Sequence, residues 1–193
     1  MGMPFAGFAP VVAVALGAAV LAGCQSEAPP TPGPSPSVTA SSASPSASAP
    51  VSPSPSASGD LPAAAKEKTE KGAEAFVAYF FAQVNAAWMT AEPSHIRGNS
   101  EPECKSCAAL AETATELQGQ GRRYAAEPID VRGITATSGA PQGQQFVQAD
   151  LVQNEVDILD AKGSVVGTDK KADFQRTVAL IWVGDRWLVY DVA

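Results

Sequence analysis

A stretch rich in serine, proline and alanine, Gln25–Pro62, most strongly limits what this chain can fold into. It has no aromatic residue and almost no large apolar one, so it cannot bury enough surface to offset its ordering entropy. The composition predicts a disordered tether with polyproline II stretches, which would reach on the order of 100 Å when fully extended at about 3.1 Å per residue, and about 35 Å as a coil. It is also typical of O-glycosylated stalks, with a bare spacer as the alternative. Folding is therefore expected in residues 63–193, the length of one domain.

The segment that precedes the tether is apolar and uncharged. Residues 1–26 contain no Asp, Glu, Lys or Arg, and the apolar run Val11–Leu21 is shorter than the about 20 residues of a membrane span. This run leads into Leu21-Ala22-Gly23-Cys24, a pattern typical of a lipobox. The pattern predicts a lipoprotein signal peptide over residues 1–23 and acylation, such as with palmitate, on Cys24. An uncleaved transmembrane helix is the alternative, and the absence of a basic start leaves the true start codon open.

An acylated Cys24 predicts a cell-membrane protein on the extracellular face, because each buried CH₂ of an acyl chain contributes about 0.8 kcal/mol and two chains make a lasting anchor. Residues 24–62 would then be the lipid anchor and linker. The net charge of −7, with all 13 Lys and Arg after Leu61, argues against a nucleic-acid partner. The expected partners are the membrane, through the anchor, and an envelope protein or a small apolar ligand.

The folded part is predicted to begin with a helix over Glu67–Thr90, because apolar residues recur there at three- and four-residue steps. A polar loop over Thr90–Asn99 is expected to follow and to leave His95, the only histidine, solvated. The residues that form the apolar face of the helix are Ala73, Phe76, Val77, Phe80, Phe81, Val84 and Trp88.

A second helix is predicted from a capping box, in which Ser100 caps the first turn and Glu103 reaches back, and it extends to about Gln118. Cys104 and Cys107 lie near its start. Residues three apart on a helix have α-carbons about 5 Å apart, inside the range that a disulfide spans. In an oxidising compartment the pair is predicted to form a structural disulfide. A redox-active pair is the alternative, and a metal site lacks further ligands.

From Arg122 onward the apolar pattern alternates with a period of two, which predicts strands. The stretch Gln144–Leu159 changes its inward phase partway, which indicates a bulge and a bend. The final hairpin, turning at Gly184-Asp185, is apolar on both faces and is expected at the centre of its sheet. The predicted strands are Ile129–Thr137, Gln144–Leu159, Ser164–Gly167, Asp173–Val183 and Arg186–Val192. The fold class is α+β, with two helices packed on a curved, cone-like antiparallel sheet of four to five strands.

Two segments, Phe76–Phe81 and Val178–Val189, resemble the first helix and last strands of the nuclear-transport-factor-2-like (cystatin-like) fold. The chain as a whole resembles uncharacterised actinobacterial lipoproteins that share a domain of unknown function. That resemblance depends on the lipobox, the tether, Gly72–Phe76 and, most specifically, Ser100–Cys107. It implies a fold and a location but no activity.

Cone folds of this kind can host isomerases and dehydratases, which need an ionisable residue in an apolar cavity. No nucleophile–base set stands out here, since His95 is alone. We therefore expect a non-catalytic binding or accessory module that needs no cofactor or metal. The alternatives are a small-molecule cavity enzyme and an extracytoplasmic thiol redox protein using Cys104 and Cys107. The weak cavity candidates are Tyr79, Trp88, Asp150, Trp182 and Tyr190, with Asp191 as a further acid.

Overall fold

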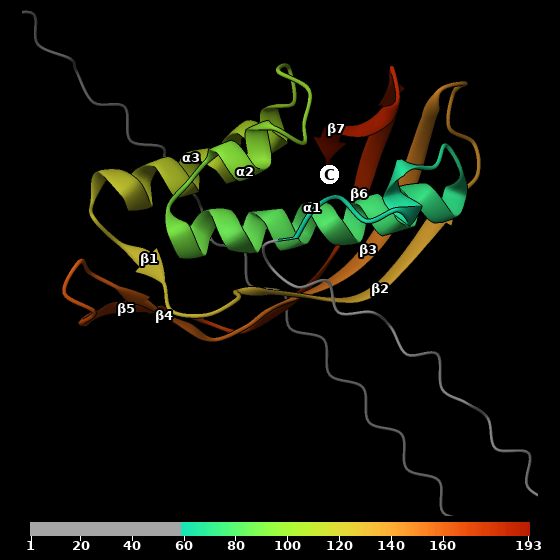
Figure 1. The fold of residues 1–193 in the computed structure, drawn as a ribbon. Helices are drawn as coiled ribbons and strands as arrows, with labels where there is room; N and C mark the ends of the chain where they lie inside the picture. The colour runs from blue at the N-terminus through green and yellow to red at the C-terminus, as the bar shows by residue number, and fades with distance from the viewer. Residues whose placement is uncertain (1–58) are drawn as a thin grey trace, which may run out of the picture. The chain divides into compact units, whose positions relative to one another are not determined.

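The computed structural model describes residues 59–193; the predicted signal peptide, Cys24 and most of the tether lie outside them. This part of the chain is α+β, as predicted (Figure 1). The helices are η1 (Ala64–Lys66), α1 (Glu70–Thr90), α2 (Ser94–Arg97) and α3 (Lys105–Gly119). The strands are β1 (Arg123–Tyr124), β2 (Ile129–Thr137), β3 (Gln144–Gln153), β4 (Val156–Leu159), β5 (Val165–Asp169), β6 (Ala172–Val183) and β7 (Arg186–Val192).

The first long helix starts at Glu70, three residues later than predicted, because the residues before it form a turn that packs against the helix. The Thr69 hydroxyl caps the helix by accepting from the Gly72 N–H at 3.0 Å. A Cβ added at Gly72 would lie 2.0 Å from the Glu67 carbonyl oxygen, so the close approach of these two backbones requires glycine. Ala65 and Leu61 pack against the core, which ties this incoming segment to α1.

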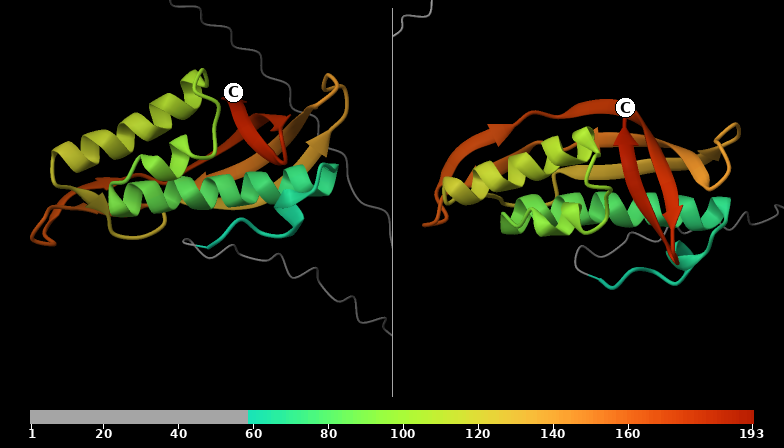
Figure 2. Two further views of the ribbon diagram at one scale, coloured as in Figure 1. Left: turned by 45° about the horizontal axis from the view of Figure 1, so that its top comes forward. Right: turned by 90° about the horizontal axis from the view of Figure 1, so that it is seen from above.

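The predicted apolar face of α1 is the centre of the core, where Phe76, Val77, Phe80 and Val84 are almost fully buried. Burying side chains of this size contributes about 1.5–3 kcal/mol each. The strands curve along one side of α1, and α2 and α3 cover its C-terminal half from the other side (Figure 2). A long first helix against a curved antiparallel sheet is the arrangement that the resemblance implied.

The strands form two antiparallel sheets, of order β1-β4-β5 and β2-β3-β6-β7, in place of the single sheet of four to five strands that we predicted. The bend predicted within Gln144–Leu159 divides that stretch into β3 and β4. At the division, the Asn154 N–H donates to the Pro128 carbonyl at 2.8 Å. This N–H therefore does not take part in the hydrogen bonding between strands. The stretch that pairs with β3 and β4 is divided at the same level, into β6 and β5. Together, β3–β4 and β5–β6 form one long hairpin that contributes to both sheets.

The final hairpin has the predicted turn, with Gly184 at φ 63°, but its position in the sheet differs from the prediction. Strand β6 is internal, whereas β7 is an edge strand. The outer edge of β7 is paired with the segment before α3: the Glu101 N–H donates to the Val189 carbonyl at 2.8 Å, and the Val189 N–H donates to the Asn99 carbonyl at 3.1 Å. These bonds satisfy backbone groups on the outer edge of β7.

This pairing also overturns the capping box predicted at Ser100. Ser100 forms a bridge with Val189 and its hydroxyl donates to the Ile96 carbonyl, so it does not cap a helix. Helix α3 begins at Lys105, with the Cys104 sulfur as its cap. Within residues 59–193, none of the helices combines the length and apolar character needed to cross a membrane.

Candidate functional site

The space between α1 and the sheet is where a cone-type cavity would lie, and apolar side chains occupy it. Phe76 is 1% exposed and Phe80 is 0% exposed. The sheet contributes Val147 and Val178, which lie opposite each other on β3 and β6 and are fully buried. A ligand would have to displace these side chains to enter.

The two cavity candidates on α1 are Tyr79 and Trp88. Each contacts other residues of the domain, and they do not line a shared cavity. Tyr79 packs at the edge of the core, with its ring 6.2 Å from that of Phe76. Trp88 donates from its indole N–H to the Leu110 carbonyl at 3.0 Å and stacks on Tyr124 at 5.6 Å. Trp88 therefore joins α1 to α3 and to β1.

The strand candidates are equally dispersed. Asp150 is exposed on β3 and accepts a hydrogen bond from Gln175. Trp182 packs edge-on against Trp187 and donates to the Gly184 carbonyl at 3.0 Å. The Tyr190 hydroxyl donates to the Gln144 side chain at 2.9 Å.

The hydroxyl of Tyr190 has a raised pKa. Burial raises the pKa of its hydroxyl, and the neighbouring Asp191 carboxylate raises it further. Asp191 itself accepts from the Ser106 hydroxyl at 2.8 Å. The structure thus does not bring the predicted cavity residues together into one site.

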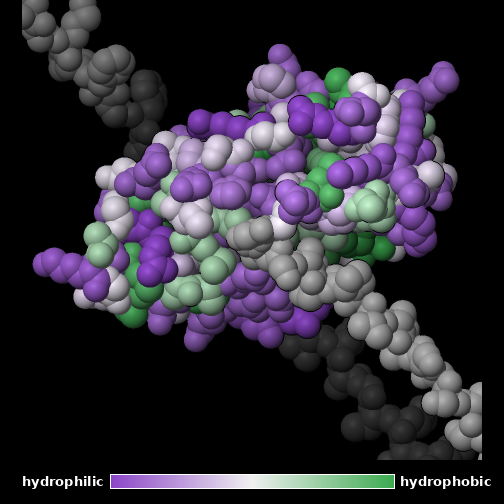
Figure 3. Space-filling model, viewed as in Figure 1, coloured by the Kyte–Doolittle hydropathy of each residue, from purple (hydrophilic) through white to green (hydrophobic). Residues whose placement is uncertain are grey.

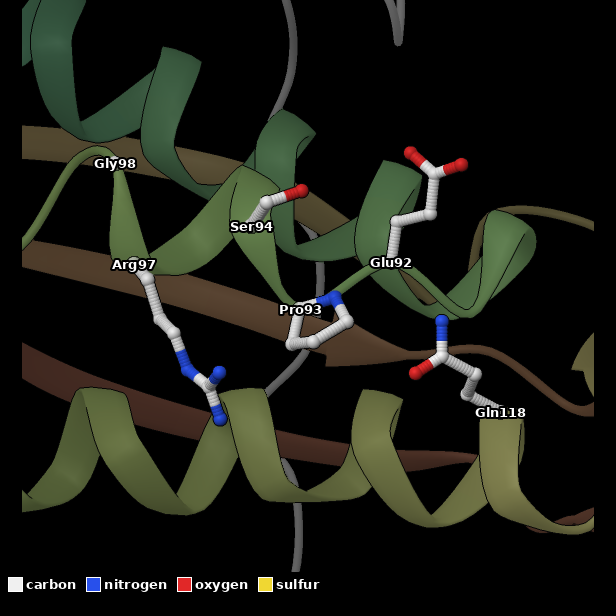
Figure 4. A pocket seen from close by; sticks show the side chains of 6 residues that line it. All are labelled: Glu92, Pro93, Ser94, Arg97, Gly98 and Gln118. Carbon is white, nitrogen blue, oxygen red and sulfur yellow. The ribbon is translucent and has the colours of Figure 1, made fainter.

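A concave surface of the described domain lies on the other side of α1, beside α2 and α3. We define the α2–α3 groove as three adjoining hollows. The first has a volume of about 490 Å³ (Figure 4). Arg97 extends from α2 toward α3 across it, and Gln118 reaches from α3 toward Pro93, while Glu92 points away. Its lining residues are Glu92, Pro93, Ser94, Arg97, Gly98 and Gln118.

The second hollow, of about 270 Å³, shares Arg97 with the first and contains the Cys104–Cys107 pair in its wall. Arg97 is exposed and forms no ion pair with any residue between 59 and 193. Ala108 and Pro102 provide apolar surface beside it. A free guanidinium next to apolar surface can bind the polar group of a mainly apolar ligand.

Cys104 and Cys107 form the predicted disulfide, with α-carbons 5.2 Å apart. The two residues are 2% and 1% exposed, so the bridge is buried in the wall of the groove. Between them, the Ser106 hydroxyl accepts from the Val192 N–H at 2.8 Å and donates to Asp191. The disulfide and Ser106 therefore fix the start of α3 against the end of β7.

The third hollow, of about 310 Å³, shares Glu92 and Gln118 with the first and reaches the turn between β4 and β5. Arg122 and Arg123 line it, together with Asp160. Asp160 is engaged in its own turn, where it accepts from the backbone N–H groups of Lys162 and Ser164.

Helix α2 and His95 differ from the predicted polar loop and solvated side chain. His95 is half-buried: its Nδ1 lies 3.0 Å from the Gln83 side-chain oxygen, and its Nε2 lies 3.4 Å from a Glu92 carboxylate oxygen. Ile96, next to it, is fully buried and packs in the core. These contacts hold α2 on α1 and so position Arg97.

The sequence patterns did not predict this groove. The available signal was Pro93, which suits the start of a helix, followed by the apolar Ile96. The groove itself depends on the packing of α2 against α3, which no single motif indicates.

The class of protein that this fold defines is an α+β domain with a long helix packed between a curved pair of sheets and two further helices. The chain belongs to a family of unknown function (DUF6318), which matches residues 39–193. A comparison with curated proteins found no match.

Among solved structures, the chain is similar to the intermembrane space region of chloroplast protein ARC6, at 13% identity and a TM-score of 0.50, over 66% of this chain and 96% of that one. It is also similar to Aln2 from a Streptomyces species, at 14% identity and a TM-score of 0.42, over 66% and 90%. An uncharacterised protein with a cystatin-like fold from Caulobacter vibrioides matches at 15% identity and a TM-score of 0.40, over 60% and 83%. The similarity to the ARC6 region is a similarity of fold alone.

Proposed function

We propose that this protein is a lipid-anchored lipoprotein of the extracellular face of the cell membrane. In this proposal the tether holds the domain off the membrane, and the domain is a non-catalytic module that binds an envelope protein or a small apolar ligand through the α2–α3 groove.

The observation that carries the binding role is the contrast between the two sides of α1. Phe76 and Phe80 occupy the side facing the sheet, where the chemistry of a cone-type enzyme would take place. The other side has a groove with an unpaired Arg97 and apolar surface at Ala108. Recognition sites commonly combine apolar walls with a few polar groups in this way.

Two observations support the location. The sequence Leu21-Ala22-Gly23-Cys24 has the residues that acylation and cleavage need. The Cys104–Cys107 disulfide is of a kind that persists in oxidising compartments. Its burial supports a structural role over thiol exchange, because exchange needs access to a sulfur atom.

The binding role can be tested with two exposed alanines that are neighbours on α3. Ala108 lines the groove, whereas Ala109 is also exposed but lines none of the three hollows. The full chain is immobilised and exposed to envelope extract and to a lipid panel. We expect a reproducible ligand that Ala108→Arg loses and Ala109→Arg retains. Loss of ligand binding in both variants, or in neither, would contradict the assignment of the groove as the binding site.

The location has a separate test. Labelled palmitate should enter the expressed protein and should no longer enter Cys24→Ser, which should also leave the membrane fraction. Equal labelling of the two proteins would exclude Cys24 as the anchor, without bearing on the groove.

A further inference from the structure

The smaller sheet, β1-β4-β5, is separated from the larger one at a single level of the long hairpin. The ladder that pairs β3 with β6 ends at Gln153, and the ladder that pairs β4 with β5 begins at Val156. Residues 154–155 on one strand and 170–171 on the other lie between the two ladders, and no backbone hydrogen bond joins them to each other. The hairpin can bend at this interruption, because no ladder bond has to break there.

The smaller sheet packs on a hydrophobic cluster of its own, beside the C-terminal ends of α1 and α3. The buried members are Ala91, Leu117, Tyr124 and Val156, and Trp88, Met89 and Ile158 pack against them. Each buried member is still 5–8% exposed, whereas Phe80, Val147 and Val178 in the main core are 0% exposed. Parts of a protein that bury little apolar surface open at a lower free energy than its core, so this sheet should open before the main core does.

Strand β5 adds little to this packing. Among the strands of residues 59–193 it pairs with β4 alone, and none of its residues is buried. Val165 is 56% exposed and Val166 is 44% exposed, and Figure 3 shows hydrophobic surface beside strongly hydrophilic surface at this end of the domain. The outer strand of the smaller sheet is therefore held by its ladder to β4 more than by side-chain packing.

Tyr124 connects the smaller sheet to α1 and to the larger sheet. Its ring stacks on that of Trp88, with the ring centroids 5.6 Å apart. Its hydroxyl donates to the Asp169 carboxylate, which also accepts from the Gln153 side chain at 3.0 Å. Asp169 is the last residue of β5 and Gln153 is the last of β3, so this carboxylate spans the interruption. The Tyr124 hydroxyl therefore helps to hold the smaller sheet in place.

The tip of the β4–β5 hairpin forms one wall of the third hollow of the α2–α3 groove. Asp160, Ala161 and Gly163 line the hollow from this hairpin, which lies beyond the C-terminal end of α1 (Figures 1 and 2). A Cβ added at Gly121, just after α3, would lie 3.8 Å from that of Ala161, so the tip comes close to the end of α3. Within the described chain, no hydrogen bond or ion pair joins residues 160–163 to α1, α2 or α3. The tip is thus placed against the helix ends without a polar contact to hold it there.

From this geometry we infer that the β1-β4-β5 sheet is a hinged flap over the third hollow. It swings as one unit at the interruption, away from the ends of α1 and α3, and its return closes the hollow over a ligand. The hinge depends on the packing of the flap itself, whereas its role as a gate rests on the proposed function of the groove. A ligand that contacts both the tip and the helix ends favours the closed form by the difference in its affinity for the two forms.

The first test is amide hydrogen exchange of the purified full chain without a ligand. We expect the amides of β4, which is internal to its sheet, to have protection factors at least about tenfold lower than those of β3 and β6. Tyr124→Phe removes the hydrogen bond to Asp169 and should lower the protection of β4 by a further factor of about ten, as expected for a hydrogen bond to a charged group, while β3 stays unchanged. Tyr190→Phe removes the bond to Gln144 on β3 and is the matched control, which should leave β4 unchanged.

The second test measures access to the cluster beneath the flap with a thiol, in a Cys24→Ser background where the disulfide leaves no other free thiol. Ala91 belongs to this cluster and lines the third hollow, whereas Ala87, one turn earlier, belongs to the main core. Ala91→Cys should react with a maleimide at a rate that Tyr124→Phe raises about tenfold. Ala87→Cys should react at least about tenfold more slowly and should not respond to Tyr124→Phe.

Three results would overturn the hinge. The first is equal protection of β4 and β3, and the second is an effect of Tyr124→Phe that spreads to β3, because the whole domain would then open together. The third is labelling of Ala91→Cys that does not respond to Tyr124→Phe.

The gate is tested by repeating the exchange measurement with a panel of small apolar fragments. Fragments that shift the amides of Gln118 and Gly121, which both line the third hollow, should raise the protection of β4 at least about threefold and leave that of β7 unchanged. Such fragments without an effect on β4 would overturn the gate and leave the binding role of the groove intact. A panel in which no fragment binds would count against the proposed function, and against the gate with it, but not against the hinge.

Discussion

The side-chain amide of Asn85 pairs with both backbone groups of Ile129. Its Nδ2 donates to the Ile129 carbonyl at 2.8 Å, and its Oδ1 accepts from the Ile129 N–H at 3.0 Å. Asn85 is buried in the C-terminal half of α1, and Ile129 is the first residue of β2. One side chain thus acts as a strand partner and fixes where β2 starts relative to the helix.

Replacing Asn85 with Leu should therefore be costly. The change leaves a buried N–H and a buried carbonyl without partners, and each unsatisfied group costs about 1–3 kcal/mol. We expect Asn85→Leu to lower the free energy of unfolding by about 2–5 kcal/mol in urea titration. The control is Asn154→Leu, whose side-chain bond to the Glu127 carbonyl is solvent-exposed and longer, at 3.3 Å. Similar losses in the two variants would contradict this account of Asn85.

Gly72 should behave unlike an ordinary helical glycine. Gly→Ala usually stabilises a helix interior by about 1 kcal/mol. At Gly72 the new Cβ would lie 2.0 Å from the Glu67 carbonyl oxygen, so Gly72→Ala should destabilise the domain by more than about 2 kcal/mol. Gly119, near the end of α3, has no heavy atom within 4 Å of an added Cβ and is the control. A Gly72→Ala variant as stable as Gly119→Ala in thermal unfolding would show that the turn before α1 is not packed as described.

The disulfide should stabilise the start of α3. Its loop is short, so reduction should cost about 1–3 kcal/mol. Comparing denaturant unfolding with and without a reductant measures this loss. A Cys104→Ser/Cys107→Ser double variant should show the same loss and no further response to the reductant. A reduced protein as stable as the oxidised one would remove the structural role of the bridge.

Glu74 should make stability depend on pH in the acid range. Burial acts to raise the pKa of its carboxyl, but a hydrogen bond from the Ala136 N–H and the Lys71 ammonium outweigh burial, so the net shift is downward. A lowered folded-state pKa gives stability that is present above the unfolded value of 4.5 and is lost as pH falls through the folded value. Glu74→Gln should remove this acid-side loss, measured as unfolding free energy between about pH 2 and 6. The exposed Glu116→Gln should retain the wild-type slope, and an unchanged slope in Glu74→Gln would contradict the assignment.

The sequence predicted features that depend on local patterns. The apolar spacing from Ala73 to Trp88 predicted α1, and the Cys-x-x-Cys spacing predicted the disulfide that is present. Strands β2 and β7 have the predicted bounds. In each case the signal lies within about one element and reflects its own periodicity or geometry.

The features that could not be predicted depend on distant partners. Ser100 and Glu103 form a good local capping pattern, but the backbone beside Ser100 pairs with Val189, and this pairing delays the helix. Helix α2 is similarly short and depends on the burial of Ile96 and on His95 contacting Gln83. The groove follows from these contacts, so it has no signature within one segment.

The central claim is that the α2–α3 groove, rather than the interior, is the binding site. The most direct test is amide NMR of the purified full chain during titration with a panel of small apolar fragments. We expect fragments to shift the amide signals of residues 94–108 and of residues near Gln118, and to leave those of Phe76, Phe80, Val147 and Val178 unchanged. Fragment-induced shifts concentrated at those four interior residues would contradict it, because they would reveal a ligand cavity between α1 and the sheet.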